Sequence, residues 1–189
     1  MSPTLKILGI VGSLRRDSFN LKLMRAAERK MPAGTELRIL TLEGIPPFNQ
    51  DEEQQPPPAV TQLKRAIRDA DALLIATPEY NYSIPGVLKN AIDWATRPYG
   101  DNPFRDKPGA LMGATIGGMG TSRAQYHLRQ VLCALNVHLL NQPELMISHA
   151  DHAFDDEGSL RDEERAAQLD KLLQALVAWT LRLKGPQSE

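Results

Sequence analysis

The sequence has little of three features that would point to particular protein classes: cysteine, net charge and long apolar runs. Cys133 is its only cysteine, which excludes an intramolecular disulfide framework and a zinc site built from several thiolates. The 22 Lys and Arg residues nearly balance 23 Asp and Glu residues, for a formal net charge of −1. Without a basic field, the chain is not expected to bind nucleic acid. No run approaches the roughly 18 uncharged apolar residues of a membrane span.

Targeting features are also lacking at the start of the sequence. The first four residues lead almost at once into an apolar run at Leu5, without the basic region, apolar stretch and cleavage site of a signal peptide. We therefore expect a cytoplasmic protein with no membrane partner. A length of 189 residues suits a single domain, residues 1–189, with a disordered tail after about residue 184.

Short apolar runs are present at strand length. Residues 5–11, 72–76 and 110–116 are nearly continuous apolar segments bounded by Gly or Pro, as expected of strands buried on both faces. Residues 36–42 alternate between apolar and polar, which favours a strand nearer the sheet edge. Residues 137–140, with a possible continuation at 145–147, would form a fifth strand.

Amphipathic stretches with helical spacing lie between these runs. Apolar stripes begin at Phe19 and Val60. A third stripe follows Pro85, a fourth follows a helix cap at either Thr121 or Ser122, and a fifth follows residues 159–162. Cys133 lies in the fourth stripe and is interpreted as a core thiol. Five strands each followed by a helix predict an α/β fold. We expect a flavodoxin-like, five-stranded parallel sheet of order 2-1-3-4-5 with helices on both faces.

In an open parallel sheet, ligands bind beyond the carboxyl ends of the strands. Three unusual loops would meet there: residues 12–20, 77–86 and 117–123. The middle loop contains two prolines and two tyrosines, so it could lie rigidly along a flat heterocycle, or could be a simple surface turn. The third loop has three glycines where a ligand could approach closely, or could be a flexible connector.

The first loop offers groups that suit an anion. Its hydroxyls at Ser13 and Ser18, the amide of Asn20 and the free N–H groups of the helix start would suit a terminal phosphate monoester. By itself this loop is equally compatible with an ordinary capped helix. Together the three loops favour a phosphorylated planar cofactor.

Long motifs resemble those of the NADPH-dependent FMN reductase family, and within it the chromate and quinone reductase branch. The resemblance rests on GSLRRDSFN at 12–20, PEYNYSIPGVLKNAIDW at 78–94 and IGGMGTSRAQYHLRQ at 116–130, and it covers most of the chain to about residue 147. It implies the same flavodoxin-like fold and an FMN cofactor.

Carried over residue by residue, the resemblance also implies the cofactor contacts. The FMN phosphate would be held by Ser13, Arg15, Ser18, Phe19 and Asn20. The isoalloxazine ring and its pyrimidine edge would be lined by Pro78, Glu79, Tyr80, Asn81 and Tyr82. The ring or the ribityl chain would lie close to Gly117 and Gly118.

The expected activity is ping-pong hydride transfer from NADPH or NADH, through bound FMN, to quinone, chromate, azo or flavin acceptors. Because the flavin carries this chemistry, neither a catalytic side chain nor a metal site is expected. The resemblance further implies a homodimer or homotetramer, with small-molecule acceptors as the other partners. The alternative is a flavodoxin-type electron carrier reduced by a partner protein, although such carriers are usually strongly acidic. A non-enzymatic regulator with this fold would not retain FMN.

Overall fold

The computed structural model describes residues 4–185, so the tail expected after residue 184 lies almost wholly outside the described residues. The described part forms one parallel sheet in the order β2-β1-β3-β4-β5, with β6 also paired to β4. This confirms the predicted order. The strands are β1 (Leu5–Val11), β2 (Thr35–Thr41), β3 (Ala72–Ala76), β4 (Pro108–Ala114), β5 (His138–Leu139) and β6 (Leu145–Ile147).

The predicted fifth strand is in fact two separate short strands. Both pair with β4 in parallel, β5 beside Pro108 and Gly109, and β6 beside residues 112–114. Leu140 N still donates to Gly109 O of β4 at 2.8 Å, but residues 141–144 leave the sheet, and they include Pro143, which has no N–H to donate to a strand partner. The other strands lie within two residues of their predicted bounds.

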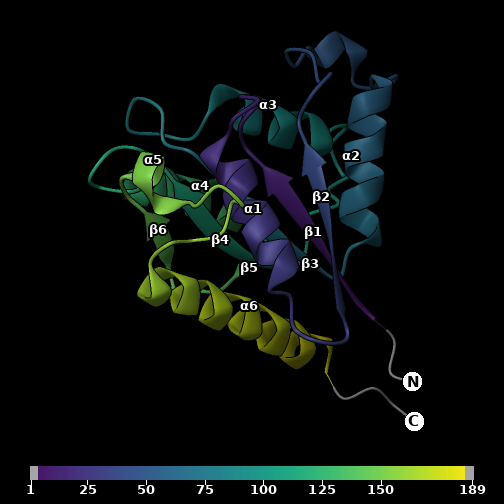
Figure 1. Cartoon of the computed structure of the whole chain (residues 1–189). Coiled ribbons are helices and arrows are strands. Elements are labelled where there is room, and N and C mark those ends of the chain that lie inside the picture. Colours follow the sequence, from purple (N-terminus) through teal and green to yellow (C-terminus); the bar gives the residue numbers. More distant parts are fainter. Residues whose placement is uncertain (1–3, 186–189) are drawn as a thin grey trace.

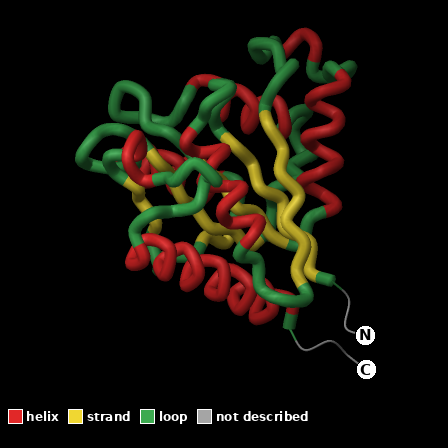
Figure 2. Tube along the Cα trace, in the orientation of Figure 1, coloured by secondary structure: helices red, strands yellow, loops and turns green. Residues whose placement is uncertain are grey.

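Helices cover both faces of the sheet (Figures 1 and 2). On one face, α1 (Phe19–Arg29) and α6 (Glu163–Lys184) pack on one apolar cluster with Ile7 and Val11 of β1. On the other face, the side chains of Leu8 and Ile10 belong to a second cluster. That cluster includes residues of α2 (Pro58–Asp69), α3 (Gly86–Ala95) and α4 (Ser122–Ala134). The alternation along β1 is that of a strand buried on both sides.

Two short helices were not predicted, because one helical turn leaves no periodic signal. They are the 3₁₀ turn η1 (Gln50–Glu52) and α5 (Ala150–Ala153). Among residues 4–185, no helix combines the length and apolarity needed to cross a bilayer.

The interpretation of Cys133 as a core thiol is wrong. Its side chain is exposed, whereas Leu128 and Leu132 on the same helix are fully buried. Successive residues of an α-helix are rotated by about 100°. Cys133 therefore faces outward, directly after a residue that faces the core.

Candidate active site

The loops that follow β1, β3 and β4 meet at one edge of the sheet, at the end opposite the one where β1 begins and α6 ends (Figure 1). Between them is a hollow of about 160 Å³. Seven of the twelve predicted cofactor residues line it: Ser13, Arg15, Ser18, Phe19, Asn20, Pro78 and Tyr80. The other five do not line it, although each lies within two residues of one that does.

The start of α1 offers N–H groups to this hollow. Ser18 is the N-cap residue, and its Oγ accepts a hydrogen bond from Leu21 N at 3.3 Å. The first turn of a helix has no intrahelical partners for its N–H groups, so those of Phe19 and Asn20 are left for a ligand. Ser13 Oγ, nearby, accepts from Arg15 N at 3.3 Å. Hydroxyls, free N–H groups and the positive end of the helix dipole make this end of the hollow suitable for an anion.

Asn20 has a second task that its sequence position did not reveal. Its side-chain Nδ2 donates to Ala114 O, and its Oδ1 accepts from Ala114 N, both at 2.9 Å. The side chain is buried and fastens the start of α1 to the last residue of β4. The side-chain amide is therefore held by the fold, while the backbone N–H and the second N–H of Nδ2 remain for a ligand.

The loop after β3 forms a tight hairpin. Tyr80 and Ser83 exchange two backbone hydrogen bonds of 3.0 Å, and the two residues between them have positive φ angles, 48° at Asn81 and 68° at Tyr82. Positive φ at both central positions is the pattern of a type I′ turn. This turn brings Pro78 and Tyr80 to the hollow, while Asn81 and Tyr82 stand beyond it.

Glu79 faces the neighbouring helix. Its carboxylate accepts hydrogen bonds from Arg123 Nε at 2.5 Å and from Ala124 N at 3.1 Å. Glu79 therefore caps α4, whereas Thr121 occupies the cap position without a side-chain capping bond, contrary to the sequence prediction. A carboxylate is a favourable partner for a helix N-terminus. Arg123 was missed, although a cation in the first turn of a helix is unusual enough to suggest an acidic partner.

Gly113 of β4 and two glycines of the third loop differ in their surroundings. A side chain at Gly113, near the end of β4, would overlap with Thr121 and with the carbonyl of Thr77. A Cβ at Gly117 would meet nothing closer than 4.0 Å, and one at Gly118 would have only the ring of His149 nearby, at 3.8 Å. Gly113 thus packs the fold together, and Gly117 and Gly118 leave open space beside the hollow.

The hollow is lined by three further residues that the sequence did not single out, Ala114, Thr115 and Ile116. Ile116 had been assigned to the end of a buried strand, but its side chain is mostly exposed. An exposed apolar side chain at this edge of the sheet indicates a site residue, because the side chains of the central strands are buried.

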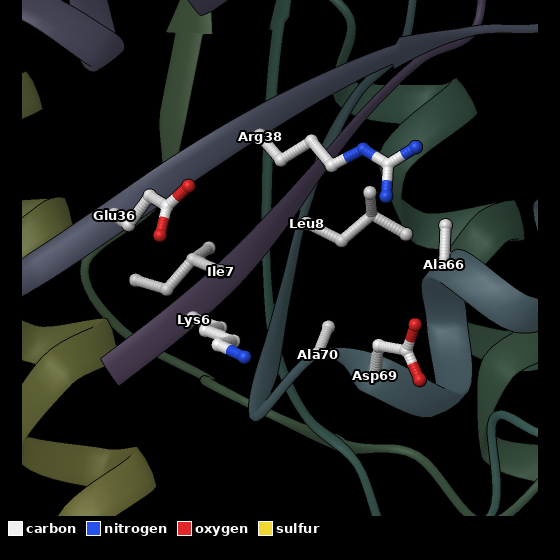
Figure 3. Close-up of a pocket in the computed structure, with 8 residues that line it drawn as sticks. All are labelled: Lys6, Ile7, Leu8, Glu36, Arg38, Ala66, Asp69 and Ala70. Carbon is white, nitrogen blue, oxygen red and sulfur yellow. The ribbon is translucent and has the colours of Figure 1, made fainter. Parts of the chain in front are cut away.

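A different hollow, of about 230 Å³, lies between β1, β2 and the end of α2 (Figure 3). Its floor includes Leu8, and its rim carries Lys6, Arg38 and Asp69. It contains none of the predicted cofactor residues. Within residues 4–185, no cluster of three or more His, Cys, Asp or Glu side chains is placed to hold a metal ion.

The groups with shifted pKa values also lie away from the candidate site. Burial would by itself raise the pKa of Asp101, but hydrogen bonds from Lys64 and Arg68 outweigh it and lower the pKa. Burial lowers the pKa of Lys107, which donates to the carbonyl of Arg68 at the end of α2. These charged groups link the loop before β4 to α2, away from the hollow, and their role is structural.

Comparison with known proteins assigns the chain and its fold to a family. The family model described as NADPH-dependent FMN reductase matches residues 5–152. An NAD(P)H-dependent FMN reductase of Pseudomonas aeruginosa is 51% identical over 98% of this chain and 100% of its own length. A 2-hydroxy-1,4-benzoquinone reductase of Burkholderia sp. is 43% identical over 93% of this chain and 96% of its own.

A solved structure agrees with this result. FerB, a flavoenzyme NAD(P)H:(acceptor) oxidoreductase of Paracoccus denitrificans, has a TM-score of 0.87 and 39% identity, covering 93% of this chain and 97% of its own. The predicted FMN cofactor, NAD(P)H donor and oxidoreductase activity are thereby confirmed. The chain belongs to the NADPH-dependent FMN reductase family.

Proposed function

We propose that FMN binds across the hollow between the loops after β1, β3 and β4, with its phosphate at the start of α1. The observation that carries this proposal is that one hollow has an end suited to a phosphate and an end suited to a flat ring system. One end offers the free N–H groups of Phe19 and Asn20, and the other is the rigid segment of Pro78 and Tyr80. The open space at Gly117 and Gly118 gives the rest of the cofactor room to extend.

The chain's own residues hold the cofactor and orient it. The hydroxyls of Ser13 and Ser18 donate to the phosphate together with the helix N–H groups, and Arg15 adds a positive charge. Pro78 and Tyr80 lie along the ring system. The chemistry supplied by bound FMN is hydride acceptance from NAD(P)H and two-electron delivery to the acceptor, so no nucleophile or base is required of the protein.

Quinones are the acceptors we favour. The Burkholderia relative is named for a benzoquinone substrate, and a relative from Solanum tuberosum, 42% identical over 97% of this chain and 96% of its own, is named NAD(P)H:quinone oxidoreductase. In this chain, Tyr80 and Ile116 line the hollow and are each more than half exposed, and so is Met119 in the third loop. Apolar and aromatic side chains suit a flat apolar acceptor. Chromate, azo compounds and free flavin are further acceptors to be compared with quinones.

The same exposed side chains support assembly with a second copy of the chain, as a homodimer or homotetramer. Clustered apolar side chains on a surface commonly mark an interface. Light scattering during size-exclusion chromatography should give a mass of two or four chains of 21.0 kDa. A single-chain mass would contradict this assignment. We place the enzyme in the cytoplasm, where NAD(P)H is available to it.

Anaerobic mixing tests the function directly. The purified FMN-loaded protein should lose its yellow colour on addition of NADPH or NADH, and benzoquinone should then restore the oxidised spectrum. A flavodoxin-type carrier, the alternative from the sequence, would stay oxidised with both nucleotides. That result would contradict the proposed function.

A further inference from the structure

The hairpin at residues 80–83 needs support from outside itself. Both of its central residues have positive φ, which is disfavoured for any residue with a Cβ and unusual for one as large as Tyr82. Tyr82 is 69% exposed, so burial of its ring does not compensate for the strained backbone. Residues that keep such a conformation are held by their surroundings.

Arg123 of α4 contacts this segment at two points. Its Nε donates to Glu79 Oε1 at 2.5 Å, immediately before the hairpin, and its guanidinium carbon lies 3.7 Å from the ring centroid of Tyr82 at the tip. One turn along the same helix, His127 Nδ1 lies 3.0 Å from Ser83 Oγ. The first turns of α4 therefore run along the hairpin and hold it from one side.

Burial makes the contact with Glu79 important. The Glu79 side chain is only 5% exposed, and an ionised carboxylate in such a place needs charged or hydrogen-bonding partners. Its partners are Arg123 and the N–H of Ala124. Without the guanidinium, the carboxylate would keep one N–H partner and would move toward water. That movement would displace the hairpin that begins at the next residue.

We propose that Arg123 is a positioning residue for the flavin ring. It acts through Glu79 and Tyr82 and holds residues 79–83 so that Pro78 and Tyr80 present a fixed surface to the ring system. This inference rests on the proposed function, because it assumes that the ring lies against Pro78 and Tyr80. The planar guanidinium can pair with a carboxylate and stack on an aromatic ring at once, which the ammonium of lysine cannot do.

Loss of Arg123 should affect the ring end of the cofactor and not the phosphate end. Arg123 is not among the residues that line the phosphate end of the hollow. Its loss should therefore weaken binding of FMN and of riboflavin, which has no phosphate, by the same factor. A change in the phosphate cradle would instead weaken FMN binding alone.

The test is titration of the full-length apoprotein with FMN and with riboflavin. Binding is monitored through the quenching of flavin fluorescence. We expect Arg123→Leu to raise both dissociation constants by about tenfold or more. Arg123→Lys should recover little of this loss. Tyr82→Leu, which leaves no buried charge unpaired, should weaken both flavins in the same direction by a smaller factor and keeps the test valid if Arg123→Leu is unstable. The matched control is Arg129→Leu on the same helix, which removes a hydrogen bond to Leu140 O and an ion pair with Glu144 and should change neither constant.

Three results would overturn the inference. Arg123→Leu and Tyr82→Leu could bind both flavins as the wild type does, Arg123→Leu could lose affinity for FMN but not for riboflavin, or Arg129→Leu could lose as much as Arg123→Leu. A wild-type protein that binds neither flavin would overturn the proposed function, and this inference with it.

Discussion

The side chain of Asn20 illustrates how single residues at this site serve the fold and the ligand together. Asn20 lies in the first turn of α1, where it looks like a polar ligand in the sequence, yet its amide pairs with both backbone groups of Ala114. A sequence pattern identifies the residue type that a site needs. It does not show which polar group has already found a partner 94 residues away.

Asn20→Ala tests this role. The substitution leaves the buried N–H and C=O of Ala114 without partners, and each unsatisfied group costs about 1–3 kcal/mol. The free energy of unfolding of the apoprotein, measured by urea denaturation, should therefore fall by about 2–6 kcal/mol. An unchanged stability together with lost FMN affinity would instead make the side chain a direct phosphate ligand.

Ser13 and Ser18 are the hydroxyls that we place at the phosphate. Replacing both with glutamate would put negative charge against the phosphate, so FMN should bind about 100-fold more weakly or worse, as juxtaposed like charges cost several kcal/mol. Isothermal titration calorimetry measures the change. The control adds the same two charges at Gln54 and Gln55, which are exposed in the loop before α2, and should bind FMN normally. Equal affinity in both double variants would refute the phosphate site.

Among the structural elements, strands and helices with a strong repeating pattern were predictable, and connections that depend on distant contacts were not. The apolar runs of β1 and β3 match their predicted bounds because both faces are buried. The division of β5 from β6 depends on where each can pair with β4. The capping of α4 by Glu79 likewise depends on a residue from another loop. Pro143 and Arg123 are local signs of these two features, but neither identifies the distant partner.

Gly113 and Gly117 form a matched pair for testing how β4 positions the loops. Gly113→Ala should destabilise the apoprotein by about 1–3 kcal/mol, because the new methyl group meets backbone at Thr77 and the side chain of Thr121. Gly117→Ala enters open space and should leave the free energy of unfolding nearly unchanged, while the methyl group hinders FMN. Thermal unfolding of both apoproteins and FMN titration measure the two effects. Similar stability losses at the two positions would contradict this assignment.

Asp71, in the loop before β3, connects β1 and α6 at the end of the sheet away from the site. Its carboxylate accepts from Lys6 N at the start of β1, at 2.7 Å, and from Lys184 Nζ at the end of α6, at 2.5 Å. Burial alone would raise the pKa of Asp71, but these hydrogen bonds lower it below its ordinary value.

This lowered pKa predicts the acid stability of the fold. A carboxyl group with a lower pKa in the folded state stabilises the protein above its unfolded pKa of about 3.9 and loses that effect as the pH falls through the folded value. Stability should therefore decline below about pH 4 in the wild type and decline less in Asp71→Asn. Urea unfolding from pH 6 to pH 2.5 compares the two, with Asp170→Asn at an exposed ion pair as the control. Parallel pH profiles for all three proteins would exclude a contribution from Asp71.

For the whole molecule, the topology does most to place the site. Once the order 2-1-3-4-5 is known, the loops after β1, β3 and β4 must share one edge, and the sequence predicted both the order and the edge. The shape of the hollow was not predictable, because it depends on side chains such as Ile116 and on the turn at residues 80–83.

The position of the cofactor is most directly tested by an experimental structure of the FMN-loaded protein. The phosphate should lie within hydrogen-bond distance of the N–H groups of Phe19 and Asn20, with the ring system against Pro78 and Tyr80. A phosphate bound elsewhere, for example in the hollow beside Lys6 and Arg38, or a ring that does not touch residues 78–80, would contradict it.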